Sequence, residues 1–216
     1  MTDHGDRSDG LEIASAIILS VAALASSWAT YQASLWDGEQ AANYSRANAL
    51  RIQASRAALE GDAMATVHVQ MFTGWLDARA RGDERLAAFY QARFPPDMKP
   101  AFNAWIAERP LANRSASPTP FASSAYSRPG SDSARELDLR ADQSFAAGEY
   151  DNAVSDAFQQ GSTLLAIALF FGGIMQVFRQ KTARTVLLVV AGAALVGGLI
   201  RLFSLPLQVL GLQAPA

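Results

Sequence analysis

The sequence predicts an all-α fold in which three transmembrane helices carry an extramembrane helical bundle. The apolar residues make up 50% of the 216-residue chain and gather in three runs. No proline interrupts residues 11–93, and much of the stretch between the first two runs consists of good helix formers. No segment shows a convincing strand pattern. We therefore expect the long loop between the first and second spans to form the bundle.

The three apolar runs predict transmembrane helices at residues 11–30, 162–178 and 183–205. A span needs about 20 apolar residues to cross about 30 Å of hydrocarbon. The second run is short and is expected to borrow a turn from Phe158 onward. The other boundaries are an N-terminal tail at 1–10, the extramembrane bundle at 31–161 with a Pro/Ser-rich loop at about 111–132, and a C-terminal tail at 206–216.

Two alternatives compete with three spans. The runs could be buried core helices of a soluble protein, although three such long runs are hard to cover in so small a chain. The first run could instead be a cleaved signal peptide, with the cleavage site at Ala23–Ala25. The preceding segment holds three aspartates and one arginine, which is the wrong charge for a signal peptide.

The short loop between the second and third spans predicts the orientation. It contains Arg179, Lys181 and Arg184 and no acid, and short basic loops stay in the cytoplasm. We expect a multi-pass protein of the bacterial plasma (inner) membrane. Its N-terminus would be cytoplasmic, and the long loop and the C-terminus would lie outside.

Two long helical arms are expected to leave the membrane as an antiparallel hairpin. The first arm continues the first span, with a kink conceivable at Asp37–Gly38 and a break favoured at Gly61–Asp62, where glycine closes one helix and aspartate opens another. The second arm covers residues 133–161. Alanines on both arms would allow close approach, namely Ala42, Ala49, Ala146 and Ala153.

Charges on the two arms suggest one register of the hairpin. Pairing outward from the membrane brings three arginines near three acids, although each exposed pair contributes only about 0–1 kcal/mol. The expected inter-helix ion pairs are Arg46 with Glu149, Arg51 with Asp142, and Arg56 with Asp138.

Shorter helices should fill the space between the arms. Each has an apolar face at helical spacing, and these faces would pack on the hairpin as a small bundle. The faces are Met64, Val67, Met71, Trp75 and Ala78; then Leu86, Phe89, Tyr90 and Phe94; then Phe102, Trp105 and Ile106. Phe121 and Tyr126 are expected to pin the Pro/Ser-rich loop.

The residues give little support for chemistry. The chain has no cysteine and a net charge of −2, so thiolate sites are excluded and no basic nucleic-acid footprint is present. His68 is expected to be a core residue with one hydrogen bond, because no second histidine or cysteine is placed to join it. We expect no catalytic residue, no metal and no cofactor, and therefore no enzyme.

Four segments in order resemble a family of uncharacterised bacterial integral membrane proteins. They are "YQASLWDGEQAANYSRANALR", "FPPDMKPAFNAWIAERP", "SPTPF" and "LFFGGIMQVFR". The resemblance covers most of the chain. It implies the same three-span layout, a bacterial origin and a plasma-membrane location, and it supplies no activity and no catalytic residues.

The leading expectation is a structural or protein-interaction component of the cell envelope. It would contact the lipid bilayer, and it would bind either a protein partner or further copies of itself. We expect no nucleic-acid partner. The alternative is a sensor or accessory subunit whose outer bundle binds a small ligand and couples it to the membrane helices. Trp36, Tyr44 and Arg51 are the expected partner or ligand face. An oligomeric pore is a further alternative, because serines give the first span a mildly polar stripe.

Overall fold

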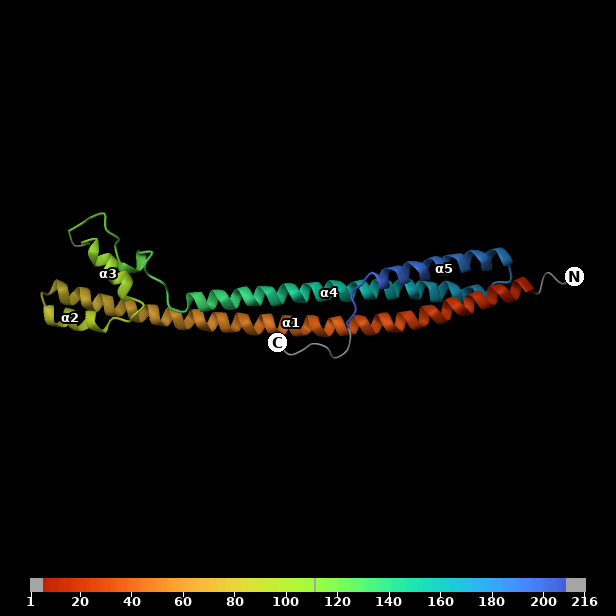
Figure 1. The fold of residues 1–216 in the computed structure, drawn as a ribbon, viewed down its shortest axis with the longest axis horizontal. Coiled ribbons are helices and arrows are strands. Elements are labelled where there is room, and N and C mark those ends of the chain that lie inside the picture. Colours follow the sequence, from red (N-terminus) through yellow and green to blue (C-terminus); the bar gives the residue numbers. More distant parts are fainter. Residues whose placement is uncertain (1–5, 111, 209–216) are drawn as a thin grey trace. The chain divides into compact units, whose positions relative to one another are not determined.

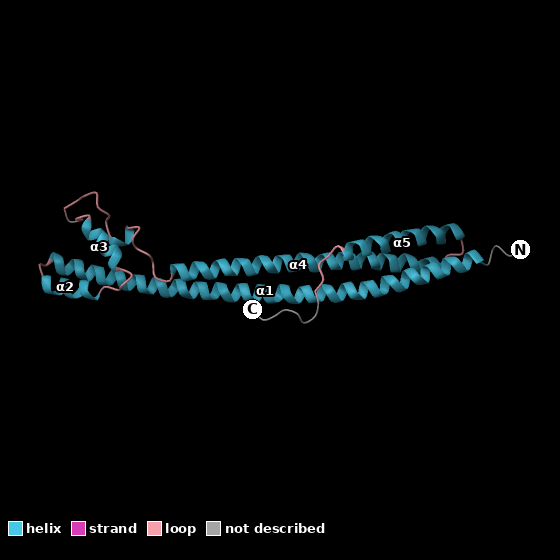
Figure 2. Ribbon diagram, in the orientation of Figure 1, coloured by secondary structure: helices cyan, strands magenta, loops and turns pink. Residues whose placement is uncertain are grey.

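The computed structural model describes residues 6–110 and 112–208, and it is all-α (Figures 1 and 2). The described residues contain no strand. Most of the expected tails, residues 1–5 and 209–216, lie outside the described part. The elements are α1 (Asp6–Ala80), α2 (Glu84–Arg93), α3 (Lys99–Ala107), the 3-10 turn η1 (Pro120–Ala122), α4 (Ser131–Ile174), the 3-10 turn η2 (Met175–Val177) and α5 (Lys181–Phe203).

The chain divides into two compact units. Unit 1 comprises Met1–Ser45 and Ser144–Ala216, and unit 2 comprises Arg46–Gln143. Helices α1 and α4 each contribute residues to both units, α5 belongs to unit 1, and α2 and α3 belong to unit 2.

Helices α1, α4 and α5 are each long and apolar enough to cross a membrane. They are the three expected spans, and they indicate a multi-pass membrane protein in contact with lipid. The most apolar stretch of each helix is largely uncovered by the rest of the chain. Large exposed side chains from these helices include Leu24, Phe170 and Ile200, which are 75%, 61% and 67% exposed. Hydrocarbon is the environment that such faces require.

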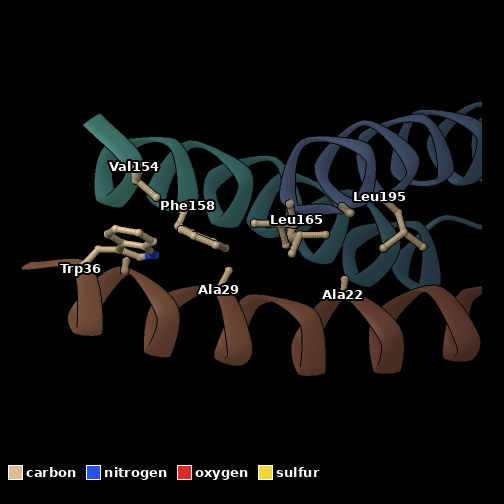
Figure 3. Close-up of a cluster of buried hydrophobic side chains, with 10 residues drawn as sticks. Ala22, Ala29, Trp36, Val154, Phe158, Leu165 and Leu195 are labelled. Carbon is tan, nitrogen blue, oxygen red and sulfur yellow. The ribbon is translucent and has the colours of Figure 1, made fainter. Parts of the chain in front are cut away.

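The interior of unit 1 is built from small residues with a few large side chains between them. Ala22 and Ala29 of α1 are fully buried, and they face Phe158 and Leu165 of α4 (Figure 3). Leu195 of α5 joins the same cluster. Small residues let helix backbones approach closely, which is how membrane helices gain packing energy without a hydrophobic driving force.

Buried positions on α1 recur every seven residues within each unit. In unit 1 they are Ser15, Ala22, Ala29 and Trp36, and in unit 2 they are Ala47, Ala54, Gly61, His68 and Trp75. A seven-residue repeat keeps one seam of a helix against its partner, as in a coiled coil. The repeat shifts by four residues between Trp36 and Ala47, because eleven residues separate them.

Polar contacts also join α1 to α4 inside unit 1. Ser26 and Ser162 share a hydrogen bond at 2.9 Å, and the Asn43 amide donates to Asp151 at 2.7 Å. Asp151 is buried, so this contact satisfies a carboxylate that would otherwise be costly to bury. The serine stripe of the first span had suggested an oligomeric pore. One hydroxyl of that stripe, Ser26, instead takes part in helix packing.

The segment after α5 is tied to α1 by a buried glutamine. The Gln32 amide donates to the Gln208 carbonyl at 3.1 Å and accepts from the Gln208 amide at 3.0 Å. At the start of α5, Arg184 lies 3.3 Å from Glu12 of α1. Both contacts fix how α1 and the α5 region pack within unit 1.

The core of unit 2 is aromatic. Its buried cluster is Phe72, Trp75, Ala78, Ala87, Phe94, Met98, Phe102 and Trp105, with Phe121 packed against it. Phe102 lies between Trp75 and Phe94, with ring centroids 4.9 and 4.8 Å away in edge-to-face geometry. Such pairs add to the energy of simple burial. The sequence correctly indicated short helices packing on α1 between the two arms.

The predicted helix faces were only partly correct. Met64, Val67, Leu86, Phe89 and Ile106 are all at least 40% exposed. The buried positions they were expected to fill are taken by Phe72 and Ala87. For Met64 and Val67 the reason is that α1 follows the seven-residue seam in this unit, which turns a different face of that helix inward.

The predicted break at Gly61–Asp62 was wrong, because α1 runs without interruption from Asp6 to Ala80. The helix also continues without interruption through Asp37 and Gly38. Gly61 is required by a close approach instead. A Cβ atom at Gly61 would lie 1.9 Å from the Pro129 carbonyl oxygen.

The prediction that four alanines bring the two arms together was also wrong. Ala42, Ala49, Ala146 and Ala153 are all exposed. Close approach uses other small residues, among them Ala47, Ala54, Ala141 and Gly148.

Candidate functional site

The most distinctive polar feature is His68 of α1, which is completely buried in unit 2. Its Nδ1 atom shares a hydrogen bond with the Tyr126 hydroxyl at 3.1 Å, and its Nε2 atom lies 3.4 Å from an Asp97 carboxylate oxygen. The acid favours a proton on Nε2, so that Nδ1 accepts the hydrogen bond from the phenol. The expectation of a core histidine with one hydrogen bond is confirmed.

Tyr126 is held in its neutral form. Partial burial raises the pKa of its hydroxyl above the usual value of 10.0, the Asp97 carboxylate raises it further, and the Arg128 guanidinium opposes both. A neutral phenol can donate to His68, and it is not a nucleophile at neutral pH. The Asp97–His68–Tyr126 arrangement therefore orients Tyr126 without activating it for covalent chemistry.

Next to this arrangement, the surface of unit 2 has a hollow of about 610 Å³. Ala65 and Val69 of α1 and Phe121 of the loop form its apolar wall, and Tyr126 and Arg128 bring polar groups to it. We call this feature the Tyr126 hollow. It combines apolar surface with a few converging polar groups, which is the composition of small-ligand sites.

The charges at the Tyr126 hollow are Arg128 and Asp62, which also lines it. They lie 3.2 Å apart, and both side chains are more than half exposed. An exposed pair of this kind contributes little to stability, so either charge can be turned toward a bound molecule at low cost. Among the described residues, no group of three or more His, Asp or Glu side chains could hold a metal ion.

Sequence reasoning found part of this site. Phe121 and Tyr126 pin the loop as expected, since Phe121 packs on Phe72 at 5.6 Å and Tyr126 reaches His68. Arg128 and Asp97 were missed, because both come from irregular segments where spacing carries no signal. A buried histidine on a seven-residue seam, which needs hydrogen-bond partners, is the clue that could have directed the search to them.

The three residues of the expected partner or ligand face have different surroundings. Trp36 is only 9% exposed and belongs to the packed cluster of unit 1, with Tyr150 edge-on at 6.0 Å. Its ring is therefore a packing element and not part of an open face. Tyr44 is half-buried and stacks on Phe145 at 5.2 Å. Arg51 is exposed in unit 2. A binding role for Tyr44 and Arg51 stays a prediction.

One of the three expected ion pairs is present in unit 2. Arg51 Nη2 lies 3.5 Å from Asp142 Oδ1, and both side chains are substantially exposed. The pairings of Arg46 with Glu149 and of Arg56 with Asp138 stay predictions.

Comparison with known proteins identifies no relative. No family model matches the chain, and neither does any curated protein or solved structure. The resemblance to a bacterial membrane-protein family therefore stays a prediction, while the three candidate spans that it implied are present.

Proposed function

We propose that the protein is a membrane-embedded sensor or accessory subunit whose unit 2 binds a small ligand in the Tyr126 hollow. The observation that carries the proposal is the hollow itself, backed by the hydrogen bond between the buried His68 and Tyr126. The hydrogen bond to the buried histidine orients the Tyr126 phenol before any ligand binds. Oriented polar groups of this kind give small-molecule sites their specificity.

The walls suggest the chemistry of the ligand. Val69, Ala65 and Phe121 offer apolar contact, while Tyr126 and Arg128 offer a hydroxyl and a cation. A compact ligand with an apolar body and one anionic or hydroxyl end fits this combination. Its anionic end would compete with Asp62 for Arg128, which charge-assisted hydrogen bonding favours.

Coupling to the membrane would run through α1. Asp62, Ala65, Thr66 and Val69 line the hollow, and they belong to the same continuous helix that supplies the first candidate span. A ligand that prefers one arrangement of this helix would shift the balance between its conformations.

The ligand-binding proposal is tested with the matched pair Ala65→Phe and Ala63→Phe in the full chain. Ala65 lines the hollow, while Ala63 is exposed on the same helix and does not line it. Thermal unfolding in detergent would be followed against a panel of small aromatic acids and alcohols. We expect a compound that raises Tm in the wild type and in Ala63→Phe, and not in Ala65→Phe. Equal shifts in both variants would contradict binding in the hollow.

The second candidate is a structural or protein-interaction component of the bacterial envelope. Ile52 and Leu59 favour it, because they are 56% and 68% exposed and seven residues apart on α1 in unit 2. Leu59→Glu should then abolish a cross-link to a partner or to a second copy in intact membranes. A cross-link that survives Leu59→Glu would argue against this face.

We further propose a bacterial inner-membrane location with the N-terminus in the cytoplasm and unit 2 outside. The basic loop with Arg179, Lys181 and Arg184 supports this orientation. Because the chain has no cysteine, single cysteines at Ser124 and Gln180 can be labelled in intact cells with a membrane-impermeant reagent. Labelling at Ser124 alone is expected. Labelling at Gln180 alone would invert the topology.

A further inference from the structure

A second hollow lies in unit 1, along the seam between α4 and α5. It has a volume of about 560 Å³. Leu164 of α4 and Gly197 and Ile200 of α5 form its apolar part. We call it the α4–α5 groove. Both helices are candidate spans, so the groove runs along surface that lipid contacts.

Polar groups gather at one end of the α4–α5 groove. Arg201 lies in the last turn of α5, Ser204 follows directly, and Gln160 and Thr163 lie on α4 where its apolar run begins. Arg201 is exposed and makes no ion pair with any residue that the structure describes. Within the described part of the chain, a cation without an ion pair therefore stands at the polar end of an otherwise apolar groove.

From this arrangement we propose that the α4–α5 groove binds one anionic phospholipid of the bilayer. The phosphate would accept hydrogen bonds from the Arg201 guanidinium, which matches phosphate in both charge and geometry. One acyl chain would lie along Gly197, Ile200 and Leu164. The occupant is identified by charge complementarity at one end and by apolar surface at the other, the two halves of a phospholipid.

Gly197 leaves the space that the acyl chain would occupy. A Cβ atom at Gly197 would meet no heavy atom within 4 Å, so the fold does not require glycine there for packing. By contrast, a Cβ at the neighbouring Gly198 would lie 2.9 Å from a Leu165 methyl group. Gly198 therefore serves the contact between helices, while Gly197 faces the groove.

The test uses the full chain, purified and freed of lipid in a neutral detergent. Native mass spectrometry would measure the binding of phosphatidylglycerol and of phosphatidylcholine with identical acyl chains. We expect one phosphatidylglycerol to bind roughly tenfold or more tightly than phosphatidylcholine. Both lipids offer a phosphate to Arg201, but the choline cation of phosphatidylcholine cancels the headgroup charge and repels the guanidinium. Arg201→Gln should remove this preference.

Two leucine variants test the groove itself. Gly197→Leu fills it and should abolish the bound lipid. Gly173→Leu is the matched control, because a Cβ at Gly173 also meets nothing within 4 Å and Gly173 does not line the groove. Arg201→Gln changes an exposed side chain, so it stays informative if Gly197→Leu fails to fold.

Three results would overturn the proposal. The first is equal retention of both lipids by the wild type. The second is unchanged binding in Arg201→Gln or in a folded Gly197→Leu. The third is a wild-type dimer that Gly197→Leu dissociates, because the occupant of the groove would then be a second copy of the chain. None of these results depends on the ligand of unit 2.

Discussion

The two units differ in the residues that dominate their interiors. Unit 1 buries mainly alanine and serine along α1 and exposes leucine, isoleucine and phenylalanine, whereas unit 2 buries a cluster of phenylalanine and tryptophan. The difference follows from the solvent. Lipid covers large apolar side chains as well as protein does, so unit 1 gains from close backbone packing. Unit 2 is formed by the more polar part of the chain, and its fold is stabilised by removing its aromatic rings from water.

Among the variants that test this comparison, Phe102→Ala should lower the stability of the protein most. Phe102 is 1% exposed among Trp75, Phe94 and Trp105, so the substitution should destabilise unit 2 by about 3–5 kcal/mol. Proteolysis of the α2–α3 region in detergent would measure it. Leu24→Ala in unit 1 is the control, because Leu24 is 75% exposed and exchanges only one lipid contact for another. Similar costs for both variants would break the comparison.

Gly61→Ala should cost about 1–3 kcal/mol, because the added methyl group collides with the Pro129 backbone and the loop must move. Gly61 is one of the places where unit 2 uses the close packing that is typical of unit 1. Gly38→Ala is the matched control within the same helix. A Cβ at Gly38 meets nothing within 4 Å, so this variant should be stabilised by up to about 1 kcal/mol through helix propensity. Chemical denaturation would give both values, and a stabilised Gly61→Ala would refute the close approach.

Gln32→Ala tests the polar contacts of unit 1. It removes both hydrogen bonds to the Gln208 backbone and leaves those groups without their partner. The expected cost is about 1–3 kcal/mol. Hydrogen exchange at residues 204–208 should become faster, while exchange in the aromatic cluster of unit 2 stays unchanged. Faster exchange in unit 2 as well would contradict the division into two units.

Composition predicted the fold class, because three apolar runs and an unbroken helical pattern leave few alternatives. The seam of α1 was harder to find. Coiled-coil seams are normally recognised by leucine and isoleucine every three to four residues, but here Ala22, Ala29, Ala47 and Ala54 occupy it. Several large side chains of the same helix point outward, and a search for apolar faces therefore selected Met64 and Val67.

The break assigned to Gly61 failed for a related reason. Glycine before aspartate signals a helix end when only the local chain is considered. At this position the loop residue Pro129, nearly seventy residues later in the chain, determines which side chain fits. The Tyr126 hollow could not be predicted from the sequence for the same reason, because Tyr126, Arg128 and Asp62 come together only through tertiary packing.

The smallest expected effect belongs to Tyr126→Phe, which tests whether the polar core of unit 2 behaves as a coupled network. Loss of the hydrogen bond to His68 should cost about 0.5–1.5 kcal/mol at neutral pH. The folded-state pKa of Tyr126 is raised above the unfolded value of 10.0. The stabilisation from this residue is therefore present below pH 10 and is lost as the pH rises through the folded pKa. Thermal unfolding of wild type and variant from pH 7 to pH 11 should show curves that converge at the alkaline end. Curves that stay parallel would mean that Tyr126 does not titrate with folding, and the polar core of unit 2 would then not be coupled to the ionisation of this phenol.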